Sequence, residues 1–168
     1  MKIHGNLINI HGVVRWLNRV WDLVHRLSAR DISGGAVNHS LADGEKALLR
    51  ATHQTIQSVS HDLEAFEFNT VVSSLMQLAN AVVAAEKKAG STAAYRESVR
   101  IMLTLMAPVT PHLAEELWEM LGESYSIHQQ AWPEADTAVA ADEMVTLVVQ
   151  VNGKVRGRLE VPAHIDRD

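Results

Sequence analysis

The chain has 168 residues, a length typical of one domain or of one domain with a small appendage. Hydrophobic residues make up 47% of it and charged residues 21%, a globular balance that excludes a disordered or fibrous protein. The net charge of −5 excludes a wholly cationic nucleic-acid binder, and the lack of cysteine excludes disulfides, thiol catalysis and sulfur-ligated zinc. The longest uncharged stretch of the helical part, residues 65–83, is interrupted by Glu67 and holds several polar residues, so we predict no membrane span. No signal-peptide pattern follows Met1, so we expect a cytoplasmic protein.

Residues 12–29 are predicted to form the first helix. Its apolar residues recur at steps of three and four, the spacing of one helical face: Val13, Leu17, Val20, Val24 and Leu27. Four bases form a row on another face: Arg15, Arg19, Arg26 and Arg30. Asp22 lies within that row and is predicted to pair with Arg19 and Arg26. The two tryptophans, Trp16 and Trp21, are expected in the core.

Four further helices are predicted from period and punctuation. They run from Asp43, as N-cap, to about Glu64; from Asn69 or Thr70 to Gly90; from Ser91 or Thr92 to just before Pro108; and from Thr110, as N-cap of Pro111, to Gly122. On the last helix Glu115, Glu116 and Glu119 are predicted to face water. Together these helices predict a bundle over residues 12–121, with residues 1–11 unassigned.

Residues 122–141 lack periodicity and are predicted to be a linker, fixed on the bundle surface by Trp132-Pro133. Two β-branched runs flank Asn152-Gly153 within residues 142–168, which predicts a β-hairpin. A two-residue turn pairs Val151 with Lys154, whereas a three-residue loop gives a more uniform apolar face. The turn type and the apolar pattern therefore predict strand registers that differ by one residue, unless a β-bulge lies between them.

The charges are unevenly distributed. Residues 1–31 carry a net charge of +3 and the remaining residues −8, although Lys154, Arg156 and Arg158 crowd near the C-terminus. Alternation along a strand predicts these three bases on one side of it. Two basic patches on an acidic body suit contact with a polyanion at defined places, and solvated surface is the simpler alternative.

The histidines and serines give little support to catalysis or metal binding. His53 and His61 are eight residues apart, whereas helical metal ligands normally lie three or four apart. His112 has helical spacing to Glu115 and Glu116, but a place near a helix start explains it equally well. No nucleophile motif or glycine-rich phosphate loop occurs. We therefore predict a binding or structural domain without catalytic residues, cofactor or metal.

Several segments resemble one family in a fixed order. Among the class Ia aminoacyl-tRNA synthetases, Trp16–Trp21 and Phe68-Asn69-Thr70 resemble the first helix and the third-helix entry of the leucyl enzymes' anticodon-binding bundle. Three further motifs are similar to the leucine, isoleucine and valine enzymes alike: Met106–Trp118, Ser126-Ile127-His128 and Trp132-Pro133. Val149–Gly157 resembles the opening hairpin of the C-terminal domain of bacterial leucyl-tRNA synthetases. The resemblance covers about residues 12–162, and the ATP-binding signatures of the family are absent.

The resemblance implies a mainly α fold: a five-helix anticodon-binding bundle, followed by a truncated C-terminal domain that begins with a β-hairpin. It implies a fragment that docks the tRNA for leucine and lacks the catalytic and editing domains, ATP and Mg²⁺ of the parent ligase. Seven bases are expected to contact RNA: Arg15, Arg19, Arg26, Arg30, Lys154, Arg156 and Arg158. The alternative is a free-standing helical-bundle metal-binding or adaptor protein.

Overall fold

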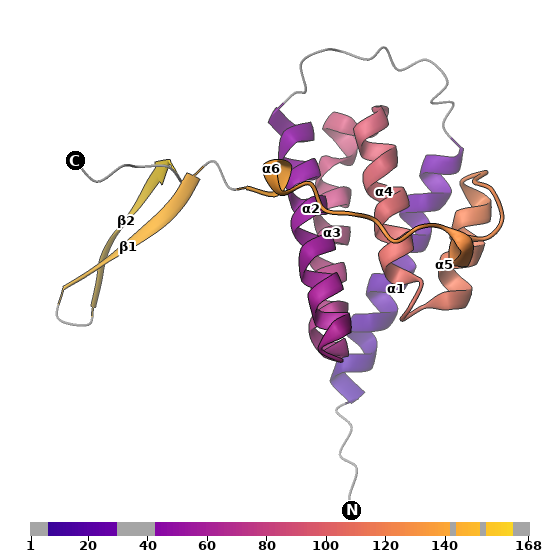
Figure 1. The fold of residues 1–168 in the computed structure, drawn as a ribbon, viewed down its shortest axis with the longest axis horizontal. Coiled ribbons are helices and arrows are strands. Elements are labelled where there is room, and N and C mark those ends of the chain that lie inside the picture. Colours follow the sequence, from indigo (N-terminus) through magenta and orange to yellow (C-terminus); the bar gives the residue numbers. More distant parts are fainter. Residues whose placement is uncertain (1–6, 30–42, 142–143, 152–153, 163–168) are drawn as a thin grey trace, which may run out of the picture.

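A computed structural model describes residues 7–29, 43–141, 144–151 and 154–162. In chain order its elements are α1 (Leu7–Ser28), α2 (Asp43–Glu64), α3 (Phe68–Ala89), α4 (Ala93–Met106), α5 (Pro111–Met120), the short 3₁₀ helix η1 (Ile127–Gln129), α6 (Thr137–Ala140), β1 (Met144–Val151) and β2 (Lys154–Pro162). The described part is mainly helical, as predicted. Figure 1 shows α1 to α5 side by side as a bundle, with α6 against α2 and the β1–β2 ribbon apart from the helices.

The core lies where the apolar stripes of α1 to α5 meet. Helix α3 contributes Val71, Leu75, Leu78 and Val82, all with at most 1% exposure, and α2 and α4 flank it. Helix α3 is, among the described helices, the one long and apolar enough to cross a membrane by length and composition. In this structure its apolar side chains pack into the bundle core.

The helix ends follow local chemistry. The Thr92 hydroxyl caps α4 by accepting a hydrogen bond from the Tyr95 backbone N–H at 3.2 Å. Pro111 is the first residue of α5, as predicted, although the Thr110 hydroxyl donates to the Met106 carbonyl and does not cap the helix. Gly122, at φ +75°, follows α5 in the left-handed conformation that glycine tolerates best.

Helix α1 differs from the prediction at its first turns and along one face. It begins at Leu7 and not at residue 12, because Leu7 and Ile10 continue a three-and-four spacing through Val14. Trp16 is buried as expected. Trp21 is 37% exposed, and Ile10 and Val14 are exposed with it, so the core prediction for Trp21 is wrong. The helix is apolar over a wider arc than the bundle covers.

The segment from 122 to 141 is more structured than a linker. It carries η1 and α6, which are too short to show a period in the sequence. The Asp136 carboxylate nucleates α6 by accepting from the backbone N–H groups of Ala138 and Val139 at 2.9 and 3.3 Å.

The ribbon pairs β1 with β2 in antiparallel register. Lys154 lies opposite Val151 and Arg158 opposite Val148, with a register shift that leaves Arg156 between the paired positions. Beyond the shift the apolar positions are opposed, as in Leu147 with Leu159. The irregularity therefore accommodates both the short turn and the apolar pattern.

Candidate nucleic-acid interface

The arginine row of α1 is exposed in the described residues, but its members differ in how their charge is compensated. Arg15 donates only to the backbone carbonyl of His11, at 3.3 Å, one turn earlier. Arg19 donates to the amide oxygen of Asn80 on α3. Neither bond supplies a negative charge. Both guanidinium groups therefore keep an uncompensated positive charge at the surface among the described residues.

Arg26 forms an ion pair between α1 and α3. Its Nε and Nη2 atoms donate to the two carboxylate oxygens of Glu86 on α3 at 3.0 and 2.9 Å, a bidentate ion pair. The hydrogen bonds that Arg26 donates to Glu86 raise the pKa of Arg26, with a smaller contribution from the charge of Asp22. The predicted pairing of Arg19 and Arg26 with Asp22 is therefore corrected: their hydrogen-bond partners lie on the neighbouring helix.

Arg15 and Arg19 border a shallow cavity between α1 and α3. Its volume is about 240 Å³, and it is lined by Gly12, Arg15, Trp16, Arg19, Met76 and Asn80. The indole Nε1 of Trp16, one of the lining residues, is buried and has no hydrogen-bond partner among the described residues. Two uncompensated cations beside a concave surface suit a phosphate group of a polyanion.

The remaining predicted bases are Arg30 and the three bases near the C-terminus. Arg30 lies outside the described residues. Lys154, Arg156 and Arg158 all lie on β2, so one strand carries the C-terminal basic patch. The structure thus puts the predicted RNA contacts on two separate elements, α1 and β2.

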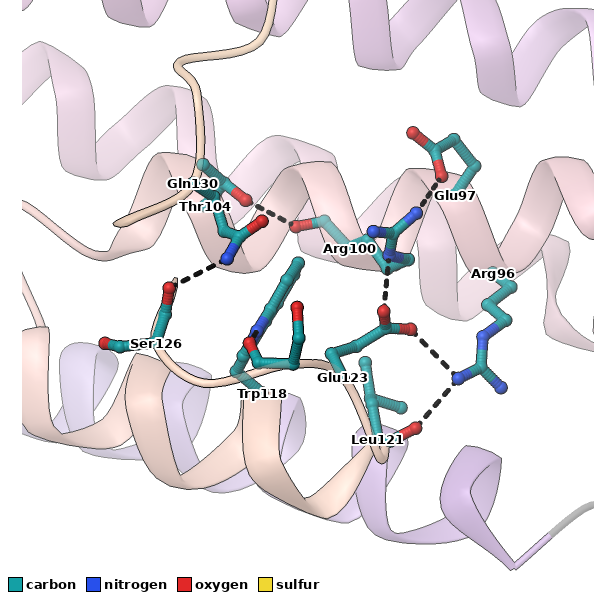
Figure 2. Close-up of polar contacts among 10 residues, drawn as sticks. Arg96, Glu97, Arg100, Thr104, Trp118, Leu121, Glu123, Ser126 and Gln130 are labelled. Carbon is teal, nitrogen blue, oxygen red and sulfur yellow. Dashed lines mark hydrogen bonds and ion pairs between the residues drawn. The ribbon is translucent and has the colours of Figure 1, made fainter. Parts of the chain in front are cut away.

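Two arginines outside the predicted set are neutralised at the junction of α4 and α5 (Figure 2). The Glu123 carboxylate bridges Arg96 at 3.0 Å and Arg100 at 3.2 Å, and Glu97 pairs with Arg100 at 2.9 Å. The Arg100 guanidinium also lies 5.4 Å from the ring centroid of Trp118, a cation–π contact. This cluster joins two helices and leaves little positive potential for a ligand.

Glu115 anchors the Ser126-Ile127-His128 motif. Its Oε2 atom accepts from the Ser126 hydroxyl at 2.5 Å and the Ile127 backbone N–H at 3.2 Å, and lies 3.7 Å from Nε2 of His128. The prediction that Glu115 faces water is therefore wrong, because the chain after α5 folds back onto this carboxylate. Glu116 and Glu119 are exposed as predicted.

A row of α2 side chains fastens residues 132–141, which we call the strap. Four hydrogen bonds do so: Trp132 Nε1 to Ser60 Oγ at 2.8 Å, Asp136 N to His53 Nδ1 at 3.1 Å, Gln54 Nε2 to the Ala140 carbonyl at 2.9 Å and Arg50 Nε to the Ala141 carbonyl at 3.0 Å. The predicted anchoring of this segment by Trp132 is correct, but three of the four contacts had no sequence signal. His53, considered as a metal ligand, is an acceptor for backbone here. No three metal-ligating side chains gather within the described ranges.

The fold and these contacts define a helical domain of a known class. The family described as the anticodon-binding domain of tRNA ligase matches residues 45–167, and the chain belongs to that family.

The relatives at the level of whole proteins are leucine–tRNA ligases. The chain is 42% identical to the leucine–tRNA ligase of Dehalococcoides mccartyi and 44% identical to that of Nostoc punctiforme, each over 95% of this chain and 19% and 18% of the relative. It is 46% identical to that of Rubrobacter xylanophilus over 94% of this chain. The chain therefore spans about a fifth of the length of the curated relatives it matches.

A solved structure shares the fold. The LeuRS of Agrobacterium radiobacter, crystallised in a ternary complex with tRNA and LeuAMS, superposes with a TM-score of 0.76 at 26% identity. The match covers 92% of this chain and 20% of that one. The resemblance inferred from the sequence motifs is confirmed.

Proposed function

We propose that this chain docks the tRNA for leucine as part of a leucine–tRNA ligase, which joins leucine to its tRNA with ATP. Membership of the anticodon-binding family, the leucine–tRNA ligase relatives and the tRNA complex of the structural neighbour support this role. The remaining domains of such a ligase are the other proposed partners, and the cytoplasm is the proposed location.

One observation in the structure carries the docking role. Among the described arginines, those at the α3 and α5 contacts are neutralised by glutamates, whereas Arg15 and Arg19 are not. RNA is bound largely through phosphate contacts from such side chains. We propose Arg15 and Arg19 as the bundle's phosphate contacts, with Arg30, Lys154, Arg156 and Arg158 completing the set. Arg26 contributes mainly by holding α1 on α3.

The ribbon is proposed to be the start of a C-terminal domain that extends the RNA contact beyond the bundle. Its three bases lie within five residues of β2. A lone two-stranded ribbon is marginal in water, so we expect it to gain stability by packing on RNA or protein.

The catalytic chemistry is proposed to lie in the other domains of the ligase. ATP and Mg²⁺ need phosphate-cradling backbone and oxygen ligands. The described residues form neither a glycine-rich phosphate loop nor a cluster of three metal ligands. An ATP–pyrophosphate exchange assay with leucine should give background activity for this chain, and activity above background would overturn that part of the proposal.

Titration of leucine tRNA with the full chain tests the docking role. We expect saturable binding that weakens steeply as salt rises from 50 to 200 mM, because each phosphate contact releases counterions. Substituting Arg15→Ala and Arg19→Ala should weaken binding and lower the salt slope. The matched pair Asn18→Ala and Asp22→Ala, exposed on the same helix, should not lower the slope. Absence of saturable binding at 50 mM salt would reject the docking role.

A further inference from the structure

The strap is held most firmly where it leaves the bundle. Three of its four hydrogen bonds to α2 fall on its last six residues, at Asp136, Ala140 and Ala141. The strap runs antiparallel to α2, because Trp132 bonds to Ser60 and Ala141 to Arg50, almost three helical turns earlier. Ala140 is 7% exposed, so α6 is seated against the bundle as well as hydrogen-bonded to it.

The last hydrogen bonds of the strap lie close in sequence to the ribbon, which is the next element of the chain. Only two residues separate Ala141 from Met144, the first residue of β1. Figure 1 shows the ribbon beginning on the side of the bundle where α6 lies against α2. The bonds at Ala140 and Ala141 thus set the point from which the basic ribbon starts.

The fastening groups are suited to positioning and not to RNA contact. His53 and Gln54 are partly buried. The ring Nδ1 of His53 and the amide Nε2 of Gln54 each form a hydrogen bond with the strap backbone. His53 accepts through Nδ1, which commits that nitrogen to the neighbouring strap.

We propose that His53, Gln54 and Arg50 are positioning residues for RNA binding: they clamp the strap on α2 and thereby fix the origin of the basic β1–β2 ribbon. The proposal rests on the tRNA docking proposed above. With the clamp closed, the ribbon and the bundle present their bases to one RNA as a pre-arranged pair. With the clamp open, the ribbon is connected through a much longer flexible segment.

The expected cost depends on the length of that connection. Opening the strap lengthens the connection between the bundle and β1 from the two residues after Ala141 to about twelve. The effective concentration of the ribbon at the bound RNA falls roughly as the −3/2 power of that length. The affinity for leucine tRNA should therefore fall about tenfold. The bundle core is not altered.

The test compares the same substitutions in the wild-type chain and in a chain whose three ribbon bases are replaced. His53→Ala with Gln54→Ala removes two clamp bonds, and the control Gln57→Ala with Ser58→Ala changes exposed neighbours on the same helix. We expect the clamp variant to lose tRNA affinity by up to about tenfold, the value for a fully opened strap, because the Arg50 and Trp132 bonds remain, and we expect no loss in the control. In a Lys154→Ala, Arg156→Ala, Arg158→Ala background the clamp variant should cause no further loss, because the ribbon no longer contributes.

Two results would overturn the proposal while leaving tRNA docking intact. One is unchanged affinity in the clamp variant when the wild-type chain binds tRNA and the triple variant binds it more weakly. The other is an equal loss in both backgrounds, which would assign His53 and Gln54 to direct contact or to folding. A wild-type chain that binds no tRNA would instead reject the docking role and, with it, this proposal.

A structural readout tests the clamp without RNA. The chain has no cysteine, so Ala84→Cys on α3 and Glu160→Cys on β2 can carry a pair of spin labels. The distance distribution between the labels should broaden in the clamp variant and stay unchanged in the control. Equal distributions in all three proteins would overturn the proposal.

Discussion

The bundle and the strap are held by different forces. In the bundle, side chains such as Leu75, Leu78 and Met102 are fully buried, so apolar burial supplies the stabilisation. The strap has little apolar burial, with Ala140 buried and Ala135 partly buried against the core, and depends more on hydrogen bonds between α2 side chains and the strap, most of them to its backbone. Such bonds contribute about 1 kcal/mol each, so they select a position more than they stabilise a fold. The bundle is therefore stabilised by its core, whereas the strap is positioned by a few polar contacts beside the ribbon that follows it.

The largest effect is expected in the bundle core. Val82→Asp places an unpaired carboxylate at a position with 0% exposure, between α3 and its neighbours. The substitution should unfold the bundle or lower its free energy of unfolding by several kcal/mol. Circular dichroism during urea unfolding measures this. The control Ala84→Asp, on the exposed face of the same helix, should retain the wild-type midpoint within experimental error.

A medium effect is expected where the chain after α5 folds back. Glu115→Ala removes the acceptor for the Ser126 hydroxyl and the Ile127 N–H, both partly buried. The free energy of unfolding should fall by about 1–3 kcal/mol, the cost of unsatisfied donors. Glu116→Ala, one residue further and exposed, should change it by less than about 0.5 kcal/mol. Equal effects of the two substitutions would contradict the structural role of Glu115.

The smallest effect on stability is expected at the α1–α3 ion pair. Because the Arg26 side chain is 45% exposed, a double-mutant cycle of Arg26→Gln and Glu86→Gln should give a coupling energy below about 1 kcal/mol that decreases with salt. The pKa of Arg26 is raised above its ordinary value, so its stabilisation is present below that ordinary value and is lost only as pH rises through the higher folded-state pKa. The Arg26 contribution should thus be constant from pH 7 to 10. A pH-dependent coupling in that range would show that another group governs the pair.

The sequence predicted the parts of the fold that depend on local chemistry. The helices of residues 43–121 followed from apolar periodicity and from punctuation such as Thr92 before α4 and Pro111 at the start of α5. The early start of α1 had a signal that was missed, since Leu7 and Ile10 continue the apolar spacing. The family was recognisable from ordered motifs.

The contacts that define the candidate interface were not predictable in the same way. Spacing along one helix is visible in a sequence and pairs Arg19 and Arg26 with Asp22, whereas their true partners, Asn80 and Glu86, lie about 60 residues away. The strap bonds join residues 72 to 91 positions apart, and three of the four involve backbone atoms, which leave no side-chain pattern. His53 therefore suggested a metal ligand, although its Nδ1 atom accepts from the Asp136 backbone.

The most direct test of the account is the salt dependence of leucine-tRNA binding by the full chain and by its Arg156→Ala, Arg158→Ala variant. If β2 meets RNA through these two bases, the slope of log affinity against log salt should fall by about two, roughly one for each lost phosphate contact, without a change in melting temperature. Affinity should fall in parallel, most strongly at low salt. An unchanged slope and affinity in a variant that melts like the wild type would contradict the claim that the ribbon held by the strap is part of the RNA-docking surface.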